Sequence, residues 1–152
     1  MERLAARISG LSRPKDVIAL YGDLGMGKSV FARAFVRSNG LPDEEVPSPT
    51  FTLVQTYEGR RPDGESLPIS HFDLYRLKSG EEIYELGFEE ALTDGVSLIE
   101  WPERAERLLP KNRLNIRISA GKNENARIVD ISAAGKSWED RLKLLKTEKT
   151  TD

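Results

Sequence analysis

The stretch that most constrains the fold of this chain carries three glycines and ends in lysine and serine. Residues 22–29 read Gly-Asp-Leu-Gly-Met-Gly-Lys-Ser and match the pattern G-x-x-x-x-G-K-[ST] in full. They follow a continuous apolar run at 16–21 and precede a segment at 28–39 whose apolar residues have helical spacing. This order of buried strand, glycine loop and helix is typical of a phosphate-binding loop.

The residue types of the loop predict the part of the ligand that each one contacts. Glycines allow successive backbone N–H groups to turn toward a phosphate, and the helix N-terminus adds partial positive charge. Lys28 is expected to reach the outer phosphates, and the Ser29 hydroxyl to bind Mg²⁺, which takes only one or two oxygens from the protein. The predicted ligand is therefore a nucleoside triphosphate with Mg²⁺. The alternative is a glycine turn that only links a strand to a helix.

An acidic residue at the end of another strand is the next candidate. Enzymes with such a loop hold a second acidic group near the metal, normally at the carboxyl end of a neighbouring buried strand. Glu100 follows the apolar run 96–99 and has that position, with an exposed strand end as the alternative. A carboxylate held there is costly unless a cation meets it, which favours the functional interpretation.

Alternating polar residues mark a further candidate strand. His71, Asp73 and Tyr75 share one face by period-two geometry, and Arg76 follows at the end. Asp73 is a candidate to orient the attacking water or a metal-bound water, and Arg76 to neutralise phosphate charge. A solvated strand face with an ordinary histidine explains the same spacing.

The remaining elements follow from apolar spacing and turn residues. Helices are expected over 2–11, 28–39, 79–86, 88–92 and 137–146, and strands over 16–21, 51–57, 67–74, 96–101, 113–119 and 126–132. Turn-rich segments join the second strand to the third and the fifth to the sixth as antiparallel hairpins. The predicted fold is the α/β three-layer P-loop NTPase fold, with a mixed, mostly parallel sheet plus antiparallel hairpins, flanked by helices. Residues 1–146 would form one domain and 147–152 a polar, disordered tail.

Composition excludes several classes of function. With no cysteine and a single histidine, the chain cannot build a zinc site, a disulfide framework or a thiol nucleophile. Its formal net charge of −2 argues against binding polyanions by bulk charge. No apolar stretch approaches the roughly 20 residues of a membrane helix, and the charged N-terminus lacks the apolar region of a secretion signal. We therefore expect a cytoplasmic protein without membrane contact.

Four segments taken together resemble the bacterial TsaE (YjeE) family. They are the phosphate loop within 20–29, Pro-Ser-Pro-Thr-Phe at 47–51, His-Phe-Asp-Leu-Tyr-Arg at 71–76 and Ile-Glu-Trp-Pro-Glu-Arg at 99–104. The resemblance spans roughly residues 4–131 and implies a small ATPase that works with the TsaB and TsaD proteins in making N6-threonylcarbamoyladenosine in tRNA. TsaD would carry out the transfer, this chain would regulate or reset the complex, and tRNA would be met only through that complex.

The resemblance also assigns roles to residues. Segments 48–51 and 71–76 would be nucleotide-sensing switches, and Ser29 and Glu100 the Mg²⁺ ligands. Asp73 would matter for hydrolysis, which makes Lys28, Asp73 and Glu100 the catalytic candidates. The candidates for contact with ATP are Gly22, Asp23, Leu24, Gly25, Met26, Gly27, Lys28, Ser29, Val30, Thr50 and Trp101.

Two departures from the family pattern bear on these roles. The family usually has Thr where this chain has Ser29, a change that preserves the hydroxyl. It also usually has several more residues before the first helix, including a Thr near the adenine that would fall close to Met1. The adenine contact and base selectivity are therefore left open, with Arg127 on the last hairpin as a further candidate for nucleotide contact.

Three other functions use the same loop. A P-loop small-molecule kinase would transfer phosphate to a positioned acceptor, although the sequence shows no arginine-rich lid insertion. A GTPase switch would need an Asn-Lys-x-Asp or Thr-Lys-x-Asp segment for guanine, and neither is present. A docking module whose shape is set by nucleotide, with incidental hydrolysis, overlaps the family interpretation and stays open.

Overall fold

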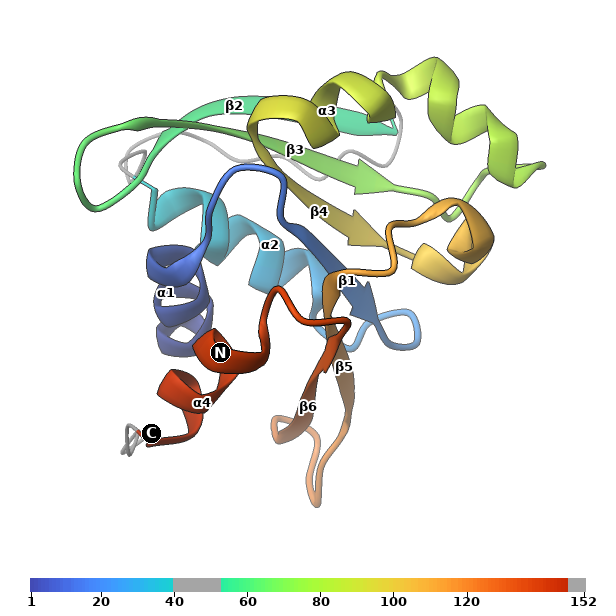
Figure 1. Cartoon of the computed structure of the whole chain (residues 1–152). Coiled ribbons are helices and arrows are strands. Elements are labelled where there is room, and N and C mark those ends of the chain that lie inside the picture. The colour runs from blue at the N-terminus through green and yellow to red at the C-terminus, as the bar shows by residue number, and fades with distance from the viewer. Residues whose placement is uncertain (40–52, 148–152) are drawn as a thin grey trace.

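One mixed sheet forms the centre of the computed structural model, which describes residues 1–39 and 53–147 (Figure 1). Within these residues the strand order is β2-β3-β4-β1-β5-β6. Neighbours among β3, β4, β1 and β5 pair in parallel, and β2 and β6 pair antiparallel at the two edges. The strands are β1 Val17–Tyr21, β2 Val54–Arg60, β3 Ser66–Asp73, β4 Val96–Glu100, β5 Arg113–Ala120 and β6 Arg127–Ala134.

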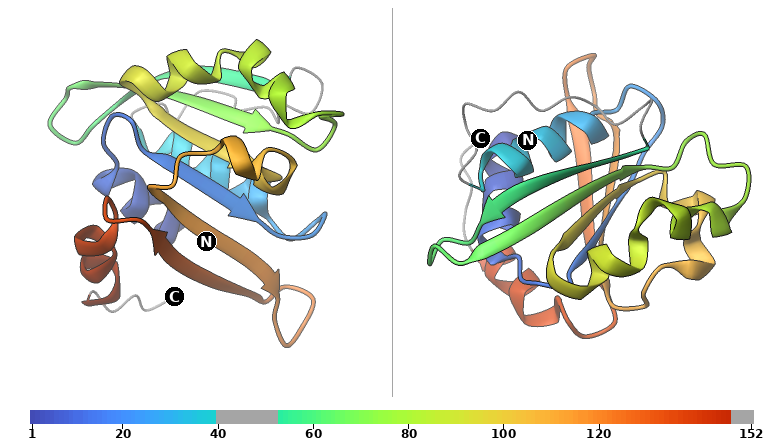
Figure 2. Two further views of the ribbon diagram at one scale, coloured as in Figure 1. Left: turned by 45° about the vertical axis from the view of Figure 1, so that its right-hand side comes forward. Right: turned by 90° about the horizontal axis from the view of Figure 1, so that it is seen from above.

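Helices cover both faces of the sheet. Figure 2 shows α1, α2 and α4 on one face and α3 with the 3₁₀ helix η1 on the other. Their bounds are α1 Glu2–Leu11, α2 Lys28–Arg37, η1 Gly80–Leu86, α3 Phe88–Asp94 and α4 Glu139–Thr147, with short 3₁₀ helices η2 Pro102–Arg104 and η3 Glu106–Leu108 after β4. The predicted fold class, three layers with a mostly parallel sheet and two antiparallel hairpins, is confirmed.

The central strand β1 explains why its sequence is continuously apolar. Every residue from Val17 to Leu20 is fully buried, because helices pack on both faces of the strand. Ile18 and Leu20 belong to the core under α1 and α2, while Val17 belongs to the core under α3. β1 is therefore buried along its length and leads directly into the glycine loop that follows Tyr21.

A buried ion pair attaches the last helix to the start of β1. Arg141 donates from Nη1 to Asp16 Oδ2 at 2.6 Å and from Nη2 to Asp16 Oδ1 at 2.9 Å. Both residues are buried, and the guanidinium carbon lies 3.9 Å from the ring centroid of Trp138. The same guanidinium donates to the Leu11 carbonyl at 2.9 Å, so it joins α4, α1 and β1 at one point.

The predicted start of the second strand is wrong. β2 begins at Val54 rather than at residue 51, because Leu53 has φ +66°, in the left-handed region. The Leu53 carbonyl accepts the Asp73 N–H at 2.9 Å, which fixes this bend beside the end of β3. Residues 51 and 52 lie outside the described residues.

Several further element bounds differ from the predicted ones by one or two residues. α2 ends at Arg37 instead of residue 39, and Asn39 Nδ2 donates back to the Phe35 carbonyl at 2.8 Å. The segment after Ser79 forms a 3₁₀ helix, with the expected capping box made by the Ser79 N–H to Glu82 Oε1 at 3.1 Å. β6 continues to Ala134, two residues beyond its predicted end.

The expected C-terminal tail overlaps the last helix by one residue, because α4 reaches Thr147. Residues 148–152 lie outside the described part of the chain, as do Thr50 and the proposed switch segment 48–51. Among the helices of residues 1–39 and 53–147, none has the length and apolar character that crossing a membrane requires.

Candidate functional site

The glycine loop leaves β1 and enters α2 in a backbone shape that only glycine adopts without strain. Gly22, Gly25 and Gly27 have φ of +151°, +83° and +108°. A Cβ on Gly22 would lie 2.6 Å from the Ile118 carbonyl oxygen, so β5 also excludes a side chain there. Gly27 is the N-cap of α2, which directs the free N–H groups of that helix toward the loop.

Lys28 is the first residue of α2, and its side chain folds back to the start of the loop. Its ammonium Nζ donates to the Gly22 carbonyl and lies 3.3 Å from the centroid of the Trp101 ring. Burial lowers the pKa of Lys28, and the carboxylates of Glu100, Glu103, Asp73 and Asp23 oppose this shift. The loop therefore surrounds a cation with acidic groups close by.

Glu100 ends β4 and meets the second residue of α2. The Ser29 hydroxyl lies 3.0 Å from Glu100 Oε1 and 3.2 Å from Oε2. Glu100 is only 3% exposed, and His71 Nε2 lies 2.6 Å from its Oε2. The exposed strand end considered for Glu100 is excluded, and the two predicted metal ligands are adjacent.

Asp73 lies beside Glu100, because β3 and β4 run in parallel with these two residues in register. Its Oδ1 accepts the Tyr75 N–H at 3.0 Å. The pKa of Asp73 is raised, mainly by burial and to a smaller extent by the nearby Glu100 carboxylate. The hydrogen bond from the Tyr75 N–H and the charges of His71 and Lys28 lower this pKa in part. A carboxylate of this kind holds a proton more readily than an exposed aspartate does.

The predicted polar face of β3 is correct for two of its three residues. His71 is fully buried and Asp73 is 7% exposed, so a solvated face is excluded. Tyr75 lies beyond the end of β3 at Asp73 and is 42% exposed. Its ring instead packs against Trp101, with centroids 4.8 Å apart, and the Arg104 guanidinium carbon lies 5.7 Å from the Tyr75 centroid.

Sequence reasoning missed the contact between Lys28 and Trp101. Trp101 follows β4 with φ +58° and ψ +49°, a left-handed conformation that is uncommon for a bulky residue. β4 is the neighbour of β1, so the residues that follow the two strands meet. The signal available in the sequence was the position of Trp101 directly after Glu100.

Arg127 contacts the loop itself. Its Nε donates to the Met26 carbonyl at 3.2 Å, and its Nη1 donates to the Glu124 carbonyl at 2.8 Å. This side chain joins the β5–β6 hairpin to the phosphate loop. Its expected contact with nucleotide stays a prediction.

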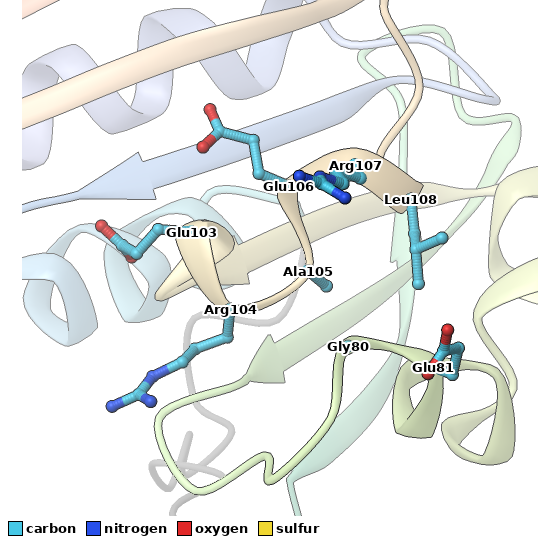
Figure 3. A pocket seen from close by; sticks show the side chains of 8 residues that line it. All are labelled: Gly80, Glu81, Glu103, Arg104, Ala105, Glu106, Arg107 and Leu108. Atoms are coloured by element: carbon cyan, nitrogen blue, oxygen red, sulfur yellow. The ribbon is translucent and has the colours of Figure 1, made fainter.

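Two hollows lie near the site. One of about 200 Å³ is lined by Gly25, Gly27, Lys28, Ser29, Val30 and Glu100. A larger one, of about 510 Å³, lies between the start of η1 and the η2–η3 segment and is lined by residues 80–81 and 103–108 (Figure 3). The two have no lining residue in common. The hollow at the loop is the one lined by Lys28, Ser29 and Glu100, the residues predicted to contact phosphate and Mg²⁺. Leu24, in the same loop, is exposed.

The donor set next to Lys28 fits Mg²⁺. Ser29 and Glu100 supply hydroxyl and carboxylate oxygens, the hard ligands that this ion prefers. Residues 1–39 and 53–147 contain no cluster of three or more His, Asp or Glu side chains suited to a metal ion. A site with two protein oxygens suits an ion that takes its other ligands from phosphates and water.

Comparisons with known proteins agree with one another. The family model for the threonylcarbamoyl adenosine biosynthesis protein TsaE matches residues 1–129. The chain is 42% identical to the tRNA threonylcarbamoyladenosine biosynthesis protein TsaE of Rickettsia conorii over 130 residues, covering 86% of this chain and 71% of that protein. For the protein of the same name from Bacillus subtilis, identity is 38%, covering 90% of this chain and 81% of the relative.

A solved structure shows the same fold. The crystal structure of Bacillus subtilis YdiB superposes with a TM-score of 0.72 at 30% sequence identity. The match covers 95% of this chain and 86% of that one.

Proposed function

The chain belongs to the TsaE family of threonylcarbamoyl adenosine biosynthesis proteins, and on that basis we propose that it is a Mg²⁺-dependent ATPase required for threonylcarbamoyladenosine formation in tRNA. The observation that carries the proposal is the buried Glu100 carboxylate, 3.0 Å from the Ser29 hydroxyl at the start of α2. TsaB and TsaD are the proposed partners, with transfer carried out by TsaD. This chain would regulate or reset that complex and meet tRNA through it.

The loop is proposed to bind the triphosphate of ATP. Its glycines leave backbone N–H groups free to face phosphate oxygens, and the N-terminus of α2 favours negative charge there. The Lys28 ammonium would exchange its contacts with the Gly22 carbonyl and the Trp101 ring for phosphate oxygens. The half-exposed Val30 and the exposed Leu24 border the same loop.

Ser29 and Glu100 are the residues proposed to hold Mg²⁺. When bound, this ion neutralises phosphate charge and orients the outer phosphates. Glu100 is suited to this role because its burial removes competing water, while its hydrogen bonds keep the carboxylate in place.

Asp73 is proposed to orient the attacking water. It lies next to Glu100 across the β3–β4 pair, and the Tyr75 N–H occupies one of its oxygens. The other oxygen can accept a hydrogen bond from water. As a base, the carboxylate must be ionised to act, so its raised pKa sets the pH below which hydrolysis is lost.

ATP hydrolysis by the purified chain tests the function as a whole. We expect slow turnover by the chain alone and faster turnover after addition of TsaB, TsaD and a substrate tRNA. Release of free phosphate with an unchanged rate, despite tight ATP binding, would instead favour a nucleotide-dependent docking module. Formation of a phosphate ester on a small acceptor would identify a kinase, and preference for GTP would revive the GTPase alternative.

Replacing Asp73 by Asn tests the assignment of the water-orienting residue. Asn keeps the size and the acceptor for the Tyr75 N–H but lacks the charge, so kcat should fall about 100-fold or more while ATP affinity changes little. In the unaltered chain, kcat/KM should decline toward acid at a higher pH than an exposed aspartate would produce. An equal loss of ATP affinity and turnover in Asp73→Asn would indicate a structural residue.

A further inference from the structure

We propose that His71 is a positioning residue, which holds the Glu100 carboxylate in the orientation that binds Mg²⁺. The inference rests on the proposed function, because it takes Glu100 as a ligand of this ion. It adds a role for the only histidine of the chain, whose side chain lies beside the site without lining the loop hollow.

The first observation is the geometry of the contact. His71 Nε2 and Glu100 Oε2 are 2.6 Å apart, a short distance for a nitrogen–oxygen hydrogen bond and typical of one that involves a charged partner. The imidazole is fully buried and the carboxylate nearly so. Neither side chain can exchange this partner for bulk water, so the contact restricts the Glu100 side chain.

The second observation is the unpaired nitrogen on the other side of the ring. His71 Nδ1 is buried and has no hydrogen-bond partner among the described residues. A carboxylate can only accept a hydrogen bond, so toward an ionised Glu100 the donor is Nε2, and Nδ1 takes no part in this contact. Among the described residues, the Glu100 carboxylate is therefore the hydrogen-bond partner of the His71 ring.

The third observation is the register of the sheet. His71 pairs with Leu98 on β4 and Asp73 pairs with Glu100, so the ring reaches the carboxylate of a residue two pairs further along the strands. The apolar residues Ile69 and Leu98 are fully buried nearby on the paired strands. A leucine or valine would fill such a core position at lower cost in desolvation. Packing alone therefore does not explain a histidine at this position, whereas its hydrogen bond to the Glu100 carboxylate does.

The carboxylate needs two supports to be fixed. Ser29 approaches both oxygens from α2, and His71 approaches Oε2 from β3. Ser29 would itself be a ligand of Mg²⁺, whereas His71 contacts the carboxylate without being a proposed ligand. His71 therefore has the place of a side chain that orients a metal ligand from behind, as partners of metal ligands commonly do.

Matched substitutions separate positioning from packing. In His71→Gln the amide nitrogen reaches about as far as Nε2, whereas in His71→Asn it stops at the position of Nδ1. His71→Met has similar length and no donor. The readout is Mn²⁺ binding, measured by electron paramagnetic resonance in the presence of a non-hydrolysable ATP analogue. Thermal melting without metal reports folding of each variant.

We expect His71→Gln to keep most of the Mn²⁺ affinity, and His71→Asn and His71→Met to lose about 10- to 100-fold. Affinity for the nucleotide analogue in the presence of a chelator should be the same in all variants. Equal Mn²⁺ affinity in the Gln, Asn and Met variants would overturn the proposal, as would a loss in folded His71→Gln that matches the loss in His71→Met.

Glu100→Gln separates this outcome from failure of the metal site. If the unaltered chain binds Mn²⁺ no better than Glu100→Gln does, the assignment of Glu100 as a ligand is wrong, and the role of His71 falls with it. If Glu100→Gln alone loses Mn²⁺ affinity and every His71 variant keeps it, only the positioning role is overturned.

Discussion

Lys28→Met should reduce kcat/KM for ATP by about 100-fold or more, on the scale found when one preorganised donor is removed from a site of developing charge. The ammonium is buried inside the glycine loop, where it contacts the Gly22 carbonyl and the Trp101 ring. Low local dielectric makes a cation in this position far more effective toward phosphate than one at the surface. Steady-state hydrolysis measures the loss of turnover, and binding of a fluorescent ATP analogue measures the loss of nucleotide affinity.

The fold of this variant should survive the change. Methionine has a similar length, and its thioether can pack against the Trp101 ring, while the desolvation that lowers the pKa of Lys28 is relieved. Lys122→Met, which removes an exposed lysine, is the matched control and should leave hydrolysis unchanged. Normal ATP affinity and turnover in Lys28→Met would exclude the phosphate-binding role.

Arg141→Met should reduce the free energy of unfolding by about 3–5 kcal/mol, the largest loss expected of any variant proposed for this chain. The substitution leaves the buried Asp16 carboxylate without its cationic partner, while the Arg13 N–H still donates to it. The midpoint of thermal unfolding should fall by at least about 6 °C in a domain of this size. The double variant Asp16→Asn with Arg141→Met removes the uncompensated charge and should recover part of the loss. Calorimetry of the three chains checks both expectations.

The same helix supplies a control. Lys143 and Asp140 form an exposed ion pair with 3.8 Å between Nζ and Oδ1, and pairs of this kind contribute little. Lys143→Met should therefore leave the unfolding midpoint unchanged. A similar midpoint for Lys143→Met and Arg141→Met would show that the buried pair does not anchor α4.

Local patterns were sufficient to predict which polar residues gather at the strand ends. The phosphate loop was evident from its glycines, and Glu100 from its position after a continuous apolar run. Parallel strands end at the same edge of a sheet, so Ser29, Asp73 and Glu100 had to meet once β3, β4 and β1 were neighbours. The fold class followed from the same runs and from the two turn-rich hairpins.

Contacts that depend on exact backbone shape could not be predicted in this way. Period-two alternation continued through Leu53, yet a left-handed residue there starts β2 later. The spacing of His71 and Asp73 gave their shared face, but it did not show that the histidine is buried against Glu100. Asp16 and Arg141 are 125 residues apart, a separation over which no local pattern operates.

The central position of β1 has a consequence for the order of events during translation. This strand leaves the ribosome before its hydrogen-bonded neighbours β4 and β5, because both follow it in the chain with several other elements in between. The nascent β1 therefore has none of its native sheet partners until β4 has been synthesised. The strand that leads into the glycine loop is enclosed in the sheet only after a long stretch of the chain that follows it has been made.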